Sequence, residues 1–329
     1  MIDLSVIICA HNPRPHYLRR VLDALRGQTL PLEQWELLLV DNASSETLAA
    51  RADLAWHPHA RHIHEPALGL TPARLRGICE ARASVLVFVD DDNVLSRDYL
   101  ANALSIATSH PQLGAWGGNI RPEFETPPPE WTRPYWKFLA TREVPRDNIA
   151  RSLAYDPAAT PFGAGMCVRR EVVLLYRQQL LHSPARQLFG RKGQSLTSAE
   201  DIDIALTACE MGLHNGLFAR LQLIHLIPPE RLTEEYLLRL CRGLAMSSLL
   251  LRLIRGIPVQ RLPCGFKWWS RFLYDCARKW GRKRRFYLSE ALGRRDACRA
   301  FAALSGPEKT GSVQQARASA LKDSPPSAI

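Results

Sequence analysis

The sequence predicts an α/β fold, a doubly wound, mostly parallel sheet, followed by a helical and basic C-terminal extension. Over the first 90 residues, short apolar runs alternate with segments of helical periodicity, which is the order of elements in a parallel sheet. Each apolar run ends in polar, turn-forming residues. With 329 residues, of which 46% are hydrophobic, the chain can build one large domain and an appendage.

The expected elements follow one another closely. Apolar and β-branched runs indicate strands, and an apolar spacing of three and four residues indicates helices. In chain order, these elements are expected at residues 4–9, 17–25, 36–40, 62–64, 71–83 and 85–89. Residues 122–161 are rich in proline and tryptophan, which indicates a long irregular insertion.

Polar side chains lie at the ends of three expected strands. Ala10 and Asn12 follow the first strand, Asp41 follows the second, and Asp90 ends the fourth. Because ligands bind beyond the carboxyl ends of strands in such sheets, we expect these residues to meet at one edge. No GxGxxG motif follows the first strand, which argues against a nicotinamide-dependent dehydrogenase.

Asp90, Asp91 and Asp92 form a run of three carboxylates after a strongly apolar strand. Adjacent carboxylates repel one another unless a cation lies between them, so the run predicts a site for a hard divalent metal. Mg²⁺ or Mn²⁺ takes few carboxylates and completes its shell with water and the oxygens of a diphosphate. A solvated acidic turn is the alternative interpretation.

Four motifs, in this order, resemble the family 2 glycosyltransferases, which have the GT-A fold. They are Ser5-Val6-Ile7-Ile8 with Asn12, Leu39-Val40-Asp41-Asn42, Phe88-Val89-Asp90-Asp91-Asp92-Asn93 and Glu200-Asp201. The resemblance covers residues 1 to about 230. It implies a hexosyltransferase-like enzyme, dependent on Mg²⁺ or Mn²⁺, that transfers a sugar with inversion from a nucleotide sugar, a UDP-sugar first. The acceptor would be a hydroxyl of a glycan or lipid-linked molecule in cell-surface polysaccharide or glycolipid synthesis.

The resemblance also implies roles at the strand ends. Asp41 would recognise the base of the donor, Asp90 would lie near the ribose or metal, and Asp92 would ligate the metal. Residues 69–78 resemble a family segment whose arginine is Arg74 and whose asparagine is replaced here by Leu75. Donor binding is thus expected at Ala10, Asn12, Asp41, Arg74, Asp90 and Asp91. Alternatively, Asp41 caps a turn and Arg74 is a surface charge.

Glu200-Asp201 resembles the family's catalytic motif. Inverting transfer needs a carboxylate that removes the proton of the acceptor hydroxyl, and Asp201 is the expected base. Glu200 or Asp203 is the alternative base. A further interpretation is an acidic first helical turn that favours the helix dipole.

Two other parts of the sequence complete the expected site. Gly163 and Gly165 lie in a segment that resembles the family's acceptor-side loop, where glycine lets the backbone approach a sugar; a tight turn is the alternative. His225 lies where related enzymes bring a histidine to the metal, and imidazole is a competent ligand. A buried core histidine is the other interpretation.

The positive charge of the chain is concentrated near its C-terminal end. Of a net charge of +11, residues 231–303 carry 17 Lys and Arg against 5 Asp and Glu. Residues 267–282 are expected to form one amphipathic helix with Trp269, Phe272 and Trp280 on or beside its apolar face. Such a helix suits an anionic membrane surface, although it can also pack on the catalytic domain. No recognised nucleic-acid module accompanies the charge, so nucleic acid is not expected as a partner.

We therefore expect a catalytic domain at 1–230, a basic helical region at 231–304 and a disordered tail at 305–329. The first residues lack the features of a signal peptide, the eight cysteines form no CxxC pair, and Arg252 and Arg255 interrupt the longest apolar stretch. A cytoplasmic protein, peripheral on the inner face of the cytoplasmic membrane, is the expectation. The alternatives are a nucleotidyltransferase, although the first strand has no phosphate-binding glycine loop, and a non-catalytic nucleotide-sugar-binding scaffold.

Overall fold

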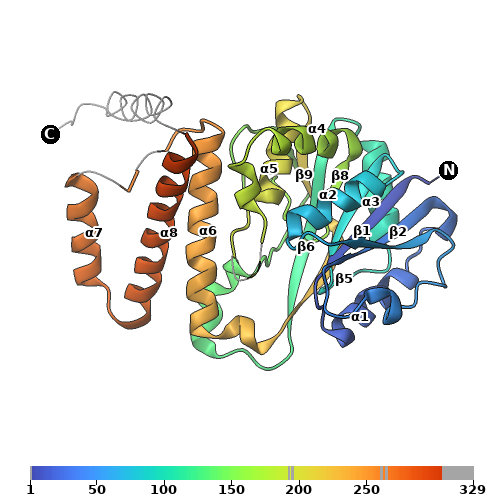
Figure 1. The fold of residues 1–329 in the computed structure, drawn as a ribbon, viewed down its shortest axis with the longest axis horizontal. Helices are drawn as coiled ribbons and strands as arrows, with labels where there is room; N and C mark the ends of the chain where they lie inside the picture. The colour runs from blue at the N-terminus through green and yellow to red at the C-terminus, as the bar shows by residue number, and fades with distance from the viewer. Residues whose placement is uncertain (1, 192, 194–195, 260–261, 264–265, 306–329) are drawn as a thin grey trace. The chain divides into compact units, whose positions relative to one another are not determined.

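The computed structural model describes residues 2–191, 193, 196–259, 262–263 and 266–305 (Figure 1). The chain divides into two compact units. The first comprises Met1–His182, Gly190–Gln194 and Glu200–Thr233. The second comprises Ser183–Phe189, Ser195–Ala199 and Glu234–Ile329.

A single sheet organises the first unit. Within the described residues it has nine strands, in the order β3-β2-β1-β4-β8-β6-β9-β5, with β7 paired to β9. The strands are β1 (Leu4–Ala10), β2 (Trp35–Asn42), β3 (Ala60–Glu65), β4 (Val85–Asp90), β5 (Asn93–Leu95), β6 (Leu113–Phe124), β7 (Asn148–Ala150), β8 (Cys167–Arg169) and β9 (His214–Ile227).

The first four strands form the parallel half of this sheet. β1 lies between β2 and β4 and is parallel to both, and β3 is parallel to β2. Beyond β4 the sheet is mixed, because β8 is antiparallel to β4 and β6 whereas β9 is parallel to β6. The predicted α/β fold class is confirmed, and the four strands expected near the N-terminus are all present.

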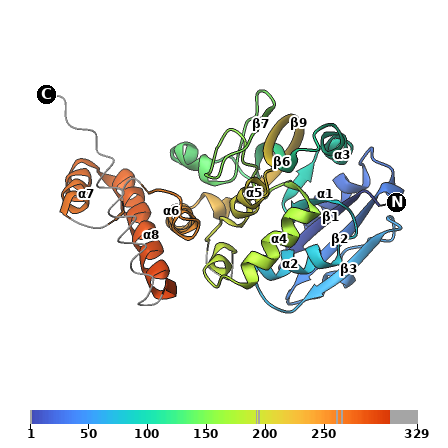
Figure 2. The same cartoon turned by 90° about the horizontal axis from the view of Figure 1, so that it is seen from above.

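Helices cover both faces of the sheet (Figures 1 and 2). Alternation along β1 directs Leu4, Val6 and Ile8 to the face that packs against α1 and α3, and Ile7 to the face that packs against α2, α4 and α5. The helices are α1 (Pro15–Arg26), α2 (Leu70–Glu80), α3 (Tyr99–Ser109), α4 (Arg170–Leu181) and α5 (Glu200–Glu210). Two apolar cores, one on each face, therefore hold the strand ends in place.

α1 illustrates how the sequence sets a helix. Pro15 begins it, where the missing N–H costs nothing, and the chain leaves it at Gly27. Leu18, Val21 and Leu25 are buried, as their spacing predicted. Burial of each such side chain contributes roughly 1.5–3 kcal/mol, so a charged residue at Val21 would detach this helix from the sheet.

The expected irregular insertion at 122–161 is confirmed. Apart from the end of β6, its regular elements are the 3-10 helix η3 (Glu130–Phe138) and the three-residue strand β7. Phe124 and Trp136 pack with ring centroids 4.7 Å apart, which ties η3 to the end of β6. The other 3-10 helices are η1 (Leu32–Gln34), η2 (Leu48–Ala50), η4 (Arg186–Phe189) and η5 (Pro229–Leu232).

The second unit is built on α6 (Glu234–Ile254), α7 (Phe266–Arg278) and α8 (Gly281–Ser305). α6 and α8 pack so closely that a Cβ at Gly293 of α8 would collide with the backbone of Arg242 in α6. Arg285 also pairs with Glu234 at 2.8 Å. None of the helices within the described ranges is long and apolar enough to cross a membrane.

The expectation of one helix over 267–282 is wrong. The helix ends at Arg278, and the chain turns through Gly281, whose φ of 53° is left-handed, into α8. Trp280 and Arg282 therefore do not belong to the same helix as Trp269. The tail expected from residue 305 lies, from residue 306 on, outside the described residues.

Candidate active site

The carboxyl ends of β1, β2 and β4 meet at one edge of the sheet, as their parallel order predicted. Ala10 faces Asp41 in the β1–β2 register, and Cys9 faces Asp90 in the β1–β4 register. The side chain of Ala10 is buried in the core, so this residue offers only its backbone to a ligand.

Asp41 is held by its own loop. Its Oδ1 accepts a hydrogen bond from the N–H of Ser44 at 3.1 Å, and its Oδ2 accepts one from the N–H of Leu48 at 3.0 Å. Burial raises the pKa of Asp41, but the hydrogen bonds from these N–H groups outweigh burial, and the pKa lies below its ordinary value. The contacts are those of a turn-capping aspartate, which fixes the loop beside the ends of β1 and β2.

Asn12 joins the loops that follow β1 and β2. Its N–H donates to Ser44 Oγ at 3.0 Å, and its Oδ1 accepts from the N–H of Ser45 at 2.9 Å. Its φ of 46° lies in the left-handed region, which asparagine tolerates better than most residues. The side chain is exposed, so the loop presents an amide to whatever binds at this edge.

The acidic run leaves β4 at Asp90 and enters β5 at Asn93. Loss of hydration, together with the charges of Asp92 and Asp90, raises the pKa of Asp91 to about 8. Burial acts in the same direction on Asp92, but Arg231 and then His225 hold the pKa of that carboxyl well below its usual range. The run is therefore a partly buried cluster and not a solvated turn.

Three polar side chains surround the carboxylate of Asp92. Asn93 Nδ2 donates to its Oδ1 at 2.9 Å, and Arg231 Nη2 lies 2.8 Å from its Oδ2. The same Oδ2 lies 3.5 Å from His225 Nε2. The backbone sets this arrangement, because Asn93 faces His225 in the β5–β9 register and Leu226 N–H donates to the carbonyl of Asp92 at 2.9 Å.

The side chains around Asp92 can supply only part of the coordination shell of Mg²⁺ or Mn²⁺, so further ligands are needed. Within the described residues, no group of three or more His, Cys, Asp or Glu side chains is arranged to hold a metal ion. Asp92 and His225 nevertheless offer a carboxylate oxygen and an imidazole nitrogen 3.5 Å apart, and ligands at ~2.1 Å from an octahedral ion stand about 3 Å apart. The remaining ligands would come from Asp90, water or a diphosphate.

Arg74 links the acidic run to α5. Its Nη2 lies 3.6 Å from Asp90 Oδ1, and its Nη1 lies 3.8 Å from Glu200 Oε1. The guanidinium also lies over the ring of Phe88, 5.2 Å from the centroid. Because the side chain is buried, Arg74 is not a surface charge; it is the cation that holds the carboxylates of two elements together.

Of the three acidic residues that begin α5, Asp201 is the accessible one. Glu200 and Asp203 are 3% and 0% exposed, whereas Asp201 is half-buried. Glu200 accepts a hydrogen bond from Thr71 Oγ1 at 2.9 Å, and burial raises its pKa against the effect of Arg74. Asp201 Oδ2 accepts the N–H of Gly163 at 2.8 Å, and its Oδ1 accepts the N–H of Ile202 at 2.9 Å.

The two candidate acceptor-side glycines lie in different surroundings. A Cβ at Gly163 would lie 2.9 Å from Arg74 Nη2 and 3.4 Å from Asp201 Cβ. This glycine therefore lies at the edge of the sheet that carries the aspartates, which we call the acidic edge. Gly165 has a φ of 71°, and its carbonyl accepts the hydroxyl of Tyr99 at 2.7 Å. The structure packs Gly165 in the core and does not bring it to the acidic edge.

Sequence reasoning missed several residues of the site. Arg231 contacts both Asp92 and His225, Asn93 holds Asp92, and the charge of Arg191 also lowers the pKa of Asp92. Arg142, whose charge interacts with that of Asp201, lies over the ring of Phe162 at 3.6 Å from the centroid. Asn93 directly follows the aspartates, so the sequence could have indicated its role, whereas no local sequence motif marks the arginines.

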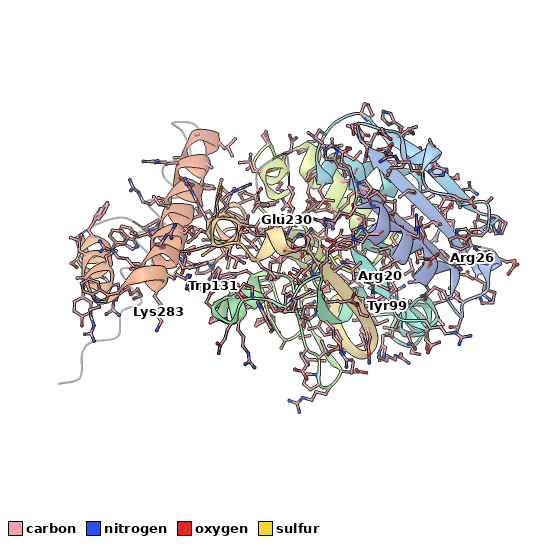
Figure 3. The ribbon with its side chains drawn as sticks, turned by 90° about the horizontal axis from the view of Figure 1, so that it is seen from below. Arg20, Arg26, Tyr99, Trp131, Glu230 and Lys283 are labelled. Carbon is pink, nitrogen blue, oxygen red and sulfur yellow. The ribbon has the colours of Figure 1, made fainter. Side chains whose placement is uncertain are left out.

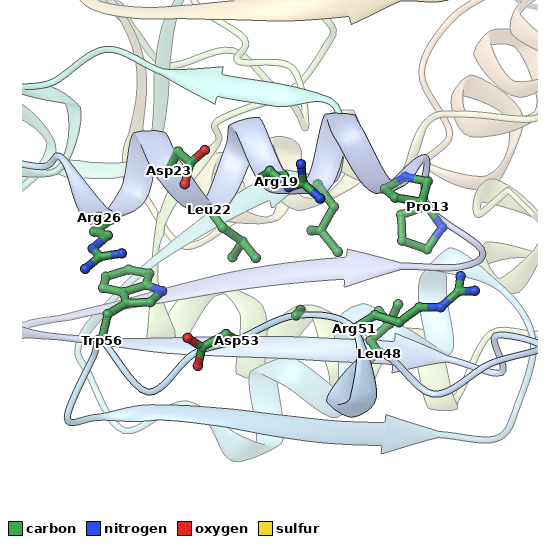
Figure 4. Close-up of a pocket in the computed structure, with 12 residues that line it drawn as sticks. Pro13, Arg19, Leu22, Asp23, Arg26, Leu48, Arg51, Asp53 and Trp56 are labelled. Carbon is green, nitrogen blue, oxygen red and sulfur yellow. The ribbon is translucent and has the colours of Figure 1, made fainter.

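A separate cleft of about 270 Å³ lies between α1 and residues 48–56 (Figure 4). Arg19, Arg26 and Trp56 line it, together with apolar side chains of α1 and η2. None of the residues that the sequence predicted for the site lines this cleft. It is therefore distinct from the acidic edge.

Comparison with known proteins identifies the family of this chain. Residues 5–174 match the family model described as Glycosyl transferase family 2, and the chain belongs to that family. The glycosyltransferase AglE of Haloferax volcanii is 29% identical over 127 residues, which cover 38% of this chain and 40% of AglE. The chain thus spans less than half the length of the curated relatives it matches.

Two solved structures share the fold. The S. aureus TarS fragment 1-349 has a TM-score of 0.51 and 15% identity, over 98% of this chain and 80% of that one. The mannosyltransferase PcManGT from Pyrobaculum calidifontis, in complex with GDP-Man and Mn²⁺, has a TM-score of 0.50 and 16% identity, over 97% of this chain and 80% of that one. At such identities the likeness establishes the GT-A architecture.

Proposed function

We propose that this protein is a glycosyltransferase that moves a sugar, with inversion, from a nucleoside-diphosphate sugar to an acceptor hydroxyl. The observation that carries the proposal is that Arg74 joins Asp90 of the acidic run to Glu200 at the start of α5, next to Asp201. Family membership supports transfer over nucleotide-sugar synthesis. The relative PcManGT, whose structure contains GDP-Man and Mn²⁺, supports a nucleotide sugar and a divalent metal as ligands.

Asp92 and His225 are the residues that would hold Mg²⁺ or Mn²⁺, with Asp90 as a further carboxylate. When bound, the ion neutralises charge that develops on the departing diphosphate. Asp41, Asn12 and the backbone at Ala10 would hold the nucleoside of the donor, a UDP-sugar first.

Asp201 is the proposed general base. Two backbone N–H groups, from Gly163 and Ile202, fix its carboxylate at the start of α5. In the single displacement, the acceptor oxygen bonds to the anomeric carbon, the bond from that carbon to the diphosphate breaks, and the hydroxyl proton passes to Asp201. Glu200 is poorly suited to this role, because Thr71 and Arg74 hold its side chain in a buried position.

The second unit supports a lipid-linked acceptor at an anionic membrane. Trp269, Leu273 and Trp280 are 42%, 63% and 80% exposed. Arg271 and Arg278 lie on the same helix as Trp269, and Lys283, labelled in Figure 3, lies in the first turn of α8. Apolar side chains inserted beside basic ones bind the surface of anionic lipids, which would bring the enzyme to the inner face of the cytoplasmic membrane.

A donor screen tests the proposed function. Purified protein would be incubated with UDP- and GDP-sugars, with and without Mn²⁺, and release of the nucleoside diphosphate measured. We expect slow, Mn²⁺-dependent hydrolysis of one donor class and little of the other. Absence of metal-dependent binding and hydrolysis for every nucleotide sugar would refute the proposal.

A further inference from the structure

Arg231 occupies the place between the two candidate metal ligands. It lies in η5, directly after β9. The preceding residue Glu230, labelled in Figure 3, accepts a hydrogen bond from Arg14 at 2.7 Å, which anchors this short turn to the start of α1. The side chain of Arg231 is 26% exposed, so solvent reaches part of it.

The hydrogen bonds of His225 define its orientation. Its Nδ1 lies 3.0 Å from the carbonyl oxygen of Leu139, so Nδ1 must carry the proton and donate. In the neutral ring, Nε2 then carries a lone pair, and it accepts from Arg231 Nη1 at 2.9 Å. A backbone carbonyl behind the ring is the support that metal-binding histidines commonly have.

Both candidate ligand atoms therefore contact one guanidinium. Arg231 Nη1 contacts His225 Nε2, while Nη2 contacts Asp92 Oδ2 at 2.8 Å. A divalent ion would bind the same two atoms. Because Nε2 of the neutral ring has a single lone pair, it can serve one cation at a time, so the ion and the guanidinium exclude each other at His225.

We propose that Arg231 is a resident counter-cation that competes with the divalent metal for Asp92 and His225. This inference rests on the proposed function. The guanidinium leaves the two ligands when metal and donor bind, and it then pairs with the diphosphate, whose oxygens match its planar fork. The metal therefore binds weakly alone and more tightly with a nucleoside diphosphate.

Arg231 also prevents an unpaired charge at Asp92 when no metal ion is bound. Without a cation, Asp92 would be a buried carboxylate beside Asp91 and Asp90, which is a costly arrangement. Arg231 neutralises it, and the turn that carries Arg231 contains only four residues, so a small backbone change withdraws the side chain. Positive cooperativity between metal and nucleotide follows from this exchange of partners.

Mn²⁺ titration followed by electron paramagnetic resonance of the free ion tests the proposal without turnover. For the natural protein, UDP or GDP, whichever it binds, should tighten the Mn²⁺ affinity at least ~10-fold. Arg231→Gln should bind Mn²⁺ alone ~10- to 100-fold more tightly, the range expected when a charged hydrogen-bonded competitor is removed. In this variant the nucleotide should tighten Mn²⁺ binding much less.

Two further variants control the test. Arg20→Gln removes a guanidinium, labelled in Figure 3, whose ion pair at 2.5 Å is with Glu123 and not with Asp92 or His225, and it should leave Mn²⁺ affinity unchanged. Arg231→Lys keeps the charge but cannot contact both ligands through one planar group, so its affinity for Mn²⁺ alone should lie between the other two. This variant also serves if Arg231→Gln fails to fold.

Unchanged or weaker binding of Mn²⁺ alone by Arg231→Gln would overturn the proposal, and so would tight Mn²⁺ binding by the natural protein without nucleotide. If Arg231→Gln does not fold, the lysine variant decides, and an affinity for Mn²⁺ alone no tighter than that of the natural protein overturns the proposal. The experiment also separates the two claims. If the protein binds neither UDP nor GDP, the proposed function fails, whereas the Mn²⁺ titration without nucleotide still reports on Arg231.

Discussion

Replacement of Arg74 by methionine should destabilise the first unit by leaving Glu200 without its cation. Methionine keeps most of the apolar stem of the side chain but removes the charge and the contact of the guanidinium with the Phe88 ring. Loss of one partner of a buried ion pair typically costs 3–5 kcal/mol. Here the two pairs are long, 3.6 and 3.8 Å, and Asp90 is partly hydrated, so we expect about 2–3 kcal/mol.

Urea denaturation followed by tryptophan fluorescence would measure this loss, and the melting temperature should fall by about 4–10 °C. The matched control is Arg74→Met combined with Glu200→Gln, because glutamine keeps a partner for Thr71 and removes the unpaired charge. The double variant should recover at least half of the lost stability. A single variant as stable as the natural protein, or a double variant no more stable than the single one, would refute the assignment of Arg74 as the cation between these carboxylates.

Three other predictions follow from the site and its surroundings. Asp92→Ala should abolish Mn²⁺-dependent binding of the nucleoside diphosphate in calorimetry while the protein stays folded; unchanged metal-dependent affinity would remove Asp92 as a ligand. Trp269→Glu with Leu273→Glu should abolish sedimentation with anionic vesicles at low salt, and no binding by the natural protein would contradict a membrane role. Burial lowers the pKa of His57 from 6.5 to about 4, so stability should fall by ~2–3 kcal/mol as the pH falls from 6.5 to 4, because the unfolded chain binds the proton first. His57→Phe should flatten this part of the curve, and an equally steep curve in that variant would assign the loss to other groups.

The choice of Leu273 for the membrane test comes from the structure. Phe272, which the sequence placed on the apolar face, stacks on Tyr287 with centroids 5.9 Å apart, and Cys276 is buried beside it. A glutamate at 272 would therefore disturb the packing of α7 on α8, and lost lipid binding would be ambiguous. Leu273 is 63% exposed and avoids this problem.

The sequence predicted the parallel half of the sheet well, because this half depends on local patterns. Buried strands such as 85–89 are continuous apolar runs, and the parallel order forces the residues after them to one edge. The later strands were not predictable in this way. β8 has only three residues, and its pairing with β4 and β6 depends on contacts between distant parts of the chain.

The same distinction applies to the site. Asp41, Asp90 and Asp92 lie at or just beyond the ends of strands and could be placed from the sequence alone. Arg231 could not, because its contact with Asp92 joins residues 139 positions apart through the β5–β9 register. The break at Gly281 had a local signal, the glycine itself, which the amphipathic spacing across it outweighed in the prediction.

The turnover of Asp201→Asn tests the central claim most directly. Asparagine keeps the shape of the side chain and an oxygen that accepts the N–H of Gly163, but it cannot take the proton of an acceptor hydroxyl. Calorimetry with the nucleoside diphosphate and Mn²⁺ should show unchanged donor-site affinity. Single-turnover transfer to the acceptor should be slower by about 10² to 10⁴. Normal turnover in this variant would contradict the assignment of Asp201 as the base.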